Sequence, residues 1–76
     1  MRDLVEFLVR ALVEKPESVE VEEFEEDGDL VLEVSVAEED LGRVIGRGGR
    51  IANAIRTVAR AAGARDERRV VVDILD

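Results

Sequence analysis

Three glycines in four positions, in the run Gly46-Arg47-Gly48-Gly49, constrain the fold of this chain more than any other feature. Glycine costs about 1 kcal/mol relative to alanine in a helix interior, so this run interrupts the apolar pattern around it. Leu41, Val44 and Ile45 precede it at helical spacing, and a longer helical repeat follows over residues 50–62. The run is therefore predicted to be a tight loop between two helices.

The segment after the loop predicts an amphipathic helix that ends at Gly63. Its apolar side is predicted to consist of Ile51, Ala54, Ile55, Val58, Ala59 and Ala62. Its polar side is predicted to consist of Arg50, Asn53, Arg56, Thr57 and Arg60.

The remaining segments predict one further helix and three strands. Residues 3–14 have helical apolar spacing that Pro16 stops, and Glu38, Glu39 and Asp40 suit the first turn of the short helix before the loop. Alternating residues predict strands over 19–26, 30–36 and 69–75. Asp27-Gly28 predicts a hairpin turn, and a bulge near Glu22-Glu23 is needed to turn Phe24 inward. The predicted architecture is one α+β domain over residues 1–76.

Charge is distributed very unevenly along a chain whose net charge is −8. Residues 1–41 contain three basic side chains against fifteen acidic ones, whereas residues 42–76 contain eight arginines against four acids. No acid lies between Asp40 and Asp66, a stretch that contains six arginines. A phosphate group responds to the local electric field of a protein surface more than to the net charge of the whole chain. Residues 42–76 can therefore bind an anion although the net charge of the chain is negative.

The composition argues against an enzyme. The chain has no cysteine and no histidine, which removes thiolate chemistry, the commonest general base and the commonest metal ligand, so that only a carboxylate–metal mechanism would remain. The acids of the predicted hairpin indicate a solvated face and lack the pattern of a calcium loop. No apolar run is long enough to span a membrane, and no signal peptide is evident. We therefore expect a cytoplasmic protein with no metal, cofactor, membrane partner or small-molecule substrate.

The glycine loop fits phosphate binding better than it fits the common nucleotide motifs. Gly49-Arg50-Ile51 lacks the Lys-Ser/Thr of a Walker A loop, and Ile51 stands where a dinucleotide fingerprint needs its third glycine. Backbone N–H groups at a helix start favour a phosphate, and glycines allow its close approach. A plain helical corner with solubilising arginines is the alternative.

The wider sequence resembles the KH domain of RNA-binding proteins. Val44-Ile45-Gly46-Arg47-Gly48-Gly49 resembles the KH signature, in which an apolar pair precedes Gly-x-x-Gly. Residues 41–63 are similar to the small single-domain bacterial KH family called KhpA, above all in the runs Gly42-Arg43-Val44-Ile45-Gly46 and Ile51-Ala52-Asn53-Ala54-Ile55-Arg56-Thr57-Val58.

This resemblance implies a type II KH fold and a function. The fold has the order α-β-β-α-α-β, with three helices on one face of a three-stranded mixed sheet. Strand 30–36 would pair antiparallel with strand 19–26 and parallel with strand 69–75. The family is described as RNA chaperones that act with a second KH protein, KhpB, in cell-envelope homeostasis and cell length.

In the KH mode, the loop clamps the backbone of about four nucleotides of single-stranded RNA. The loop residues expected to contact phosphate are Gly46, Arg47, Gly48 and Gly49. The supporting arginines are expected to be Arg43, Arg50 and Arg56, and Val44 and Ile45 are expected to lie near the groove that holds the RNA. Phe7 and Phe24, the only aromatic residues, lie far from the loop on faces predicted to be buried, so base stacking is excluded and sequence specificity should be low.

The first predicted helix has more apolar residues than one sheet face readily covers, which indicates a partner surface. We therefore expect a homodimer, or a heterodimer with a KhpB-type protein. A module that only binds proteins through this helix, without contacting RNA, is the alternative function.

Overall fold

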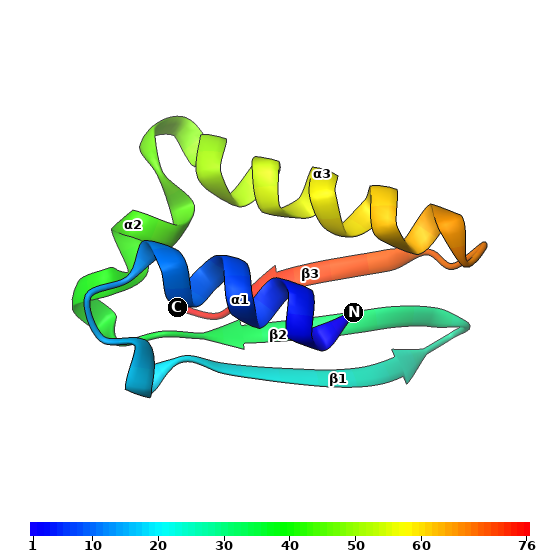
Figure 1. The fold of residues 1–76 in the computed structure, drawn as a ribbon, viewed down its shortest axis with the longest axis horizontal. Coiled ribbons are helices and arrows are strands. Elements are labelled where there is room, and N and C mark those ends of the chain that lie inside the picture. The colour runs from blue at the N-terminus through cyan, green and yellow to red at the C-terminus, as the bar shows by residue number, and fades with distance from the viewer.

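The computed structural model describes residues 1–76 and has the predicted order of helices and strands (Figure 1). The elements are α1 (Arg2–Leu12), β1 (Glu20–Glu26), β2 (Asp29–Ser35), α2 (Leu41–Ile45), α3 (Arg50–Arg65) and β3 (Val70–Ile74). Short 3₁₀ turns at Pro16–Ser18, Glu38–Asp40 and Arg47–Gly49 connect them. Each predicted element is therefore confirmed, although several boundaries differ.

The three strands form one mixed sheet in the order β1-β2-β3. β1 and β2 pair antiparallel across the Asp27-Gly28 turn, and β2 pairs parallel with β3. A parallel pair needs a long crossover, and α2, the glycine loop and α3 form it. Figure 1 shows α1 and α3 on the same face of the sheet. This topology confirms the predicted α+β fold with a mixed sheet.

The core lies between the sheet and the helices. Val5 and Val9 of α1 and Ile55 and Ala59 of α3 meet residues from all three strands there, as well as Val44 of α2. The strand residues of this core are Val21, Leu32, Val34, Val70 and Val72. Their alternate spacing confirms the predicted inward faces of β2 and β3. Val44 is the residue through which the core reaches the segment just before the glycine loop.

The predicted bulge in β1 is wrong. β1 pairs with β2 in unbroken register, from Glu20 opposite Ser35 to Glu26 opposite Asp29. Phe24 consequently lies on the uncovered face of the sheet, in one cross-strand row with Val31 and Val71. Because β1 is an edge strand that the helices only partly cover, its acids on the helix side remain in water and no bulge is needed.

The two phenylalanines are also more exposed than predicted. Phe24 is 37% exposed on the open sheet face, and Phe7 is 70% exposed on α1. Phe7 lies outside the core because α1 buries only its Val5 and Val9 side against the sheet. Phe24 lies outside the core because it is on the face of the sheet that no helix covers. The predicted excess of apolar surface on the first helix is therefore confirmed.

Helix α3 differs from its prediction in both length and buried face. It continues through Gly63 to Arg65, and its buried residues are Ala52, Ile55, Ala59 and Gly63. A Cβ on Gly63 would lie 2.4 Å from Val70 Cγ2 and 2.8 Å from the Arg68 carbonyl oxygen. This glycine is required by the close approach of β3 and does not end the helix.

Candidate nucleic-acid interface

The backbone of the glycine loop adopts conformations that only glycine enters readily. Gly46, Gly48 and Gly49 have φ values of 75°, 64° and 78°. Gly46 also has ψ near 171°, a region that is essentially closed to side chains. The spacing of the three glycines is thus explained by backbone geometry.

The three glycines serve different purposes. A Cβ on Gly46 would lie 2.7 Å from Ile51 Cγ1, so the loop packs directly onto the first turn of α3. A Cβ on Gly48 or on Gly49 would meet no atom within 4 Å. Gly46 therefore closes the loop against the protein, whereas Gly48 and Gly49 leave its outer side open to a ligand.

Backbone hydrogen bonds hold the loop in this shape. The Gly46 N–H donates to the Gly42 carbonyl at 2.9 Å, and the Gly49 N–H donates to the Gly46 carbonyl at 3.1 Å. No side chain caps the start of α3, where Gly49 occupies the cap position. N–H groups in an uncapped first turn are available to an anion, which the helix dipole also favours.

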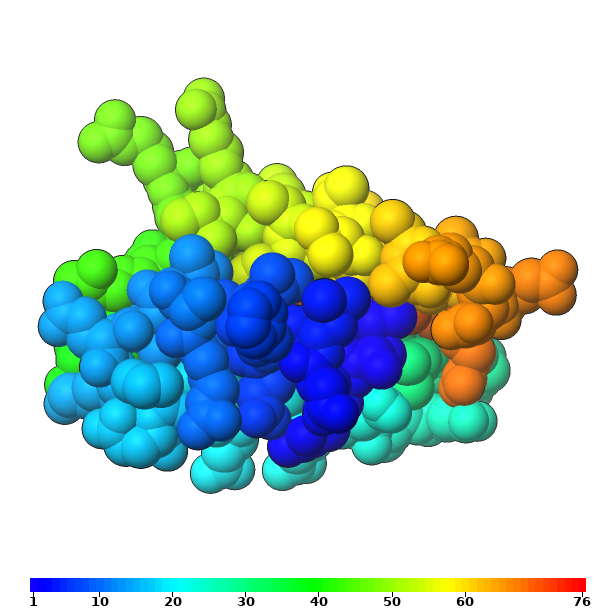
Figure 2. Space-filling model, in the orientation of Figure 1, coloured from blue at the N-terminus to red at the C-terminus, as the bar shows by residue number.

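The arginines within the loop and along α3 have no acidic partners. The ion pairs of the protein involve six of its eleven basic side chains, and the five without one are Arg47, Arg50, Arg56, Arg60 and Arg65. Arg47 and Arg50 are exposed on either side of Gly48 and Gly49. Figure 2 shows side chains of this yellow-green segment projecting away from the body of the molecule. The loop therefore presents free positive charge.

The other predicted site residues occupy less direct positions. Val44 is fully buried and Ile45 is partly buried, so Val44 supports the loop from within. Arg43 forms ion pairs with Glu14 and with Asp40, the latter at 3.5 Å. Arg56 lies farther along α3 and donates from Nε to the Val72 carbonyl of β3 at 3.2 Å.

Asp40 anchors α2 beneath the loop. Its side chain is 1% exposed, and its two carboxylate oxygens accept hydrogen bonds of 3.0 Å from the backbone N–H groups of Glu14 and Lys15. The Glu14 N–H bond is the main cause that lowers the pKa of Asp40 below its ordinary value, and burial opposes it. The sequence predicted only that Asp40 interacts favourably with the helix dipole. Because α1 ends at Leu12, the backbone N–H groups of Glu14 and Lys15 can bond to Asp40 instead of continuing the helix.

An apolar groove between α1 and α3 was only partly predicted. Its lining includes Leu8 and Leu12 of α1 and Ala54 and Val58 of α3. Val58 is 43% exposed, so Ala54 and Val58 are not part of the buried stripe that the sequence indicated. The apolar arc of α3 is wider than the sheet can cover, and the excess faces outward beside α1.

The fold and the loop together define a KH domain. The order α-β-β-α-α-β, the mixed sheet and a Gly-x-x-Gly loop between the last two helices all agree with it.

Comparison with known proteins places the chain more narrowly. Residues 2–74 match the family described as KhpA/KhpB, KH domain. The RNA-binding protein KhpA of Clostridium perfringens is 48% identical over 75 residues, which cover 99% of this chain and 100% of that protein. The RNA-binding protein KhpA of Halalkalibacterium halodurans is 45% identical over 76 residues and 100% of both chains. The chain belongs to the KhpA/KhpB KH-domain family.

Proposed function

We propose that this chain is a non-enzymatic protein that binds single-stranded RNA by clamping about four nucleotides at the Gly46–Gly49 loop. The observation that carries this proposal is the open loop itself. Gly48 and Gly49 leave space for a phosphate, and Arg47 and Arg50 flank that space without carboxylate partners. The names of the relatives, RNA-binding protein KhpA, support the same ligand.

Base discrimination should be weak in this mode. Neither aromatic residue lies at the loop: Phe7 is on α1 and Phe24 is on the opposite, uncovered face of the sheet. Backbone clamping without stacking favours any flexible single strand, which suits an RNA chaperone. We propose that the protein acts on RNA in this way in the cytoplasm.

The loop can be tested with the double variant Arg47→Asp/Gly48→Asp, which places two acids where a phosphate should lie. We expect RNA binding, measured by fluorescence anisotropy, to be lost while circular dichroism shows an intact fold and stability falls by only about 1 kcal/mol, the cost of a side chain at the positive φ of Gly48. The matched control is Arg65→Asp/Gly28→Asp. It makes the same chemical changes at an unpaired arginine of α3 and at a glycine of positive φ in open space. Full binding by the loop variant would refute the proposal.

A second candidate function is assembly with another KH protein. The apolar groove between α1 and α3 and the exposed Phe7 and Val58 offer a surface for a second copy or for a KhpB-type partner. We propose a homodimer or such a heterodimer, because burying this strip would remove exposed apolar area from water. Residues 46–49 are not part of the lining of this groove, so assembly need not block the loop, although Arg50 belongs to both surfaces.

Sedimentation equilibrium at micromolar concentration tests self-association. Val58→Arg should shift the protein toward monomer, whereas Val71→Arg, a similarly exposed valine on the open sheet face, should not. A wild-type chain that is strictly monomeric would refute the homodimer and leave only the heterodimer, for which co-purification with a KhpB-type protein is the measurement.

The family also suggests a cellular role. We propose that the chain works with a KhpB-type protein in control of the cell envelope and of cell length. Complementation of a deletion strain with the wild type and with Arg47→Asp/Gly48→Asp tests this role, with cell length as the readout. Equal rescue by both genes would show that the role does not need the loop.

A further inference from the structure

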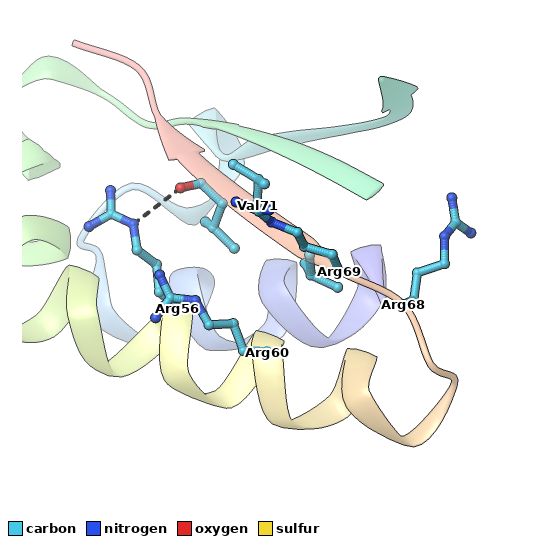
Figure 3. A pocket seen from close by; sticks show the side chains of 7 residues that line it. Arg56, Arg60, Arg68, Arg69 and Val71 are labelled. Carbon is cyan, nitrogen blue, oxygen red and sulfur yellow. Dashed lines mark hydrogen bonds between the residues drawn. The ribbon is translucent and has the colours of Figure 1, made fainter. Parts of the chain in front are cut away.

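The face of the sheet that the helices leave uncovered carries an apolar row. Phe24 of β1, Val31 of β2 and Val71 of β3 stand directly opposite one another across the three strands. Phe24 and Val71 are each 37% exposed, and Val31 is half-buried between them. Figure 3 shows Val71 on the side of β3 away from Arg56 and Arg60 of α3. Apolar side chains that gather on an exposed surface and are rimmed by charges are typical of interaction sites.

Acidic rows lie on both sides of this apolar row. Their members are Glu22, Glu33 and Asp73 on one side and Glu26 and Asp29 on the other, with Asp27 in the adjoining hairpin turn. The only ion pair among these acids joins Asp29 to Arg69, at 3.7 Å. The apolar row is therefore bordered by carboxylates that have almost no cationic partners within the protein.

The row of Glu22, Glu33 and Asp73 lowers the stability of the isolated domain. Like charges directly opposite one another on neighbouring strands repel, and here three carboxylates stand in one line. No basic side chain pairs with any of the three. The row therefore serves no purpose in holding the fold together, whereas a cationic partner would replace the repulsion by attraction.

The spacing of the rows fits a helix laid across the strands. Residues two apart along a strand are separated by about 6.7 Å, so the two acidic rows lie about 13 Å apart. The apolar row extends over about 10 Å, because neighbouring strands are about 4.8 Å apart. A helix with its side chains is about 10–12 Å wide and rises about 10.8 Å in two turns. An apolar stripe on such a helix covers the row, while basic side chains on its two flanks reach the acids.

We propose that this open face docks a basic amphipathic helix of another protein. Its apolar side chains would lie on Phe24, Val31 and Val71, and its lysines or arginines would lie on the two acidic rows. Two copies of this face repel each other, and the face repels RNA for the same reason. Residues 46–49 do not line the hollow around the apolar row. The protein can therefore hold RNA at the loop and a basic protein on the open face.

The probe is a fluorescein-labelled peptide with two copies of the repeat Leu-Lys-Lys-Leu-Leu-Lys-Leu, which has the pattern of a basic amphipathic helix. Fluorescence anisotropy should show binding that weakens as salt rises, and the same peptide with glutamate in place of lysine should not bind. Val71→Arg should weaken binding by about tenfold or more, because it removes apolar contact and places a cation among the lysines. Val58→Arg, the same change in the groove between α1 and α3, should bind like wild type.

The acids give a second readout. Glu22→Gln/Glu33→Gln should weaken peptide binding by about fivefold, as expected for two exposed charge contacts. The same variant should raise the thermal midpoint, since it removes like-charge repulsion. The matched control, Glu23→Gln/Glu67→Gln, removes equal charge from the other face of β1 and from the turn after α3, and should leave binding unchanged. Acids with a purely structural role would not combine higher stability with weaker binding.

Several results would overturn the proposal. Unchanged peptide binding in Val71→Arg, or an equal loss in Val58→Arg, would remove the open face as the site. Tighter binding of a peptide of alternating leucine and lysine, a pattern that favours a strand, would refute the helix. A shift of Val71→Arg toward monomer in sedimentation equilibrium would assign the face to a second copy of the chain. The loop variant Arg47→Asp/Gly48→Asp should bind the peptide like wild type, which separates this proposal from RNA binding.

Discussion

Up to residue 43, every basic side chain of this protein is paired with a carboxylate, whereas between residues 47 and 65 none is. The paired residues of the first region are Arg2, Arg10, Lys15 and Arg43. Two of these ion pairs connect the end of α1 to the segment around α2, namely Lys15 with Glu39 and Arg43 with Glu14. Positive charge is thus used inside the protein in the first region and is left free for a ligand in the second.

The acids reinforce this contrast. The open face of the sheet carries a cross-strand row of Glu22, Glu33 and Asp73, next to the row that contains Phe24. Such a face repels RNA and leaves the loop and α3 as the favourable approach. Net charge therefore says little about this protein, because its two kinds of charge are separated in space. Substitutions in the two regions should therefore affect different properties.

The largest effect on stability is expected inside the loop, at Gly46. Gly46→Ala should lower the free energy of unfolding by about 3 kcal/mol, from backbone strain and overpacking against Ile51 together. Gly48→Ala should cost about 1 kcal/mol, because only backbone strain applies there. Urea denaturation measures both. Equal costs would mean that the loop does not pack on α3 as described.

Asp40 should make the stability of the fold depend on pH in the acid range. Because its pKa is lowered in the folded state, its contribution is present above the ordinary carboxyl pKa of about 3.9 and is lost as pH falls below that value. Asp40→Asn should lower the thermal midpoint at neutral pH and reduce the further loss of stability as pH falls below about 4. Glu38→Gln, which removes a carboxylate from the same turn, is the control. An acid response identical to that of wild type would remove Asp40 from this role.

The salt dependence of RNA binding should separate free arginines from paired ones. With three or four phosphate contacts, log K should fall with log salt at a slope of about −2 to −3. Arg47→Gln should make this slope shallower by about 0.7, whereas Arg43→Gln should leave it unchanged, since Glu14 and Asp40 hold that side chain. A lower slope in Arg43→Gln would show that phosphate displaces those carboxylates.

The smallest effect is expected on α1. Arg10 pairs with Glu6 at 3.3 Å, an exposed pair one helical turn apart. Arg10→Gln should cost only about 0.3–0.5 kcal/mol of stability and should not change RNA affinity. A clear loss of RNA affinity in this variant would contradict the division between paired and free regions.

Much of this architecture is determined locally. Alternation in β2 and β3, the Asp27-Gly28 turn and the glycine loop each reflect backbone preferences that act over a few residues. The loop is the clearest case, because three positive φ values require three glycines wherever the chain takes this path. Element order and the loop site were predictable for that reason.

Other features depend on what a segment meets in space. The local pattern predicts a helix end at Gly63, but this glycine lies inside the helix, where its lack of a side chain leaves room for Val70. The predicted bulge was needed only if the helices covered all of β1, and they do not. Asp40 became a buried anchor because residues 14 and 15, far away in sequence, turn their N–H groups toward it.

The sequence by itself therefore determined the elements, their order and the position of the glycine loop, since these follow from short-range backbone preferences and apolar periodicity. Only the tertiary structure decided which charges are paired and which apolar residues stay exposed. It alone brings Arg68 and Arg69 near Arg56 and Arg60, in a groove between α3 and β3. Pairing and exposure depend on distances between segments remote in sequence, and packing against the sheet sets those distances.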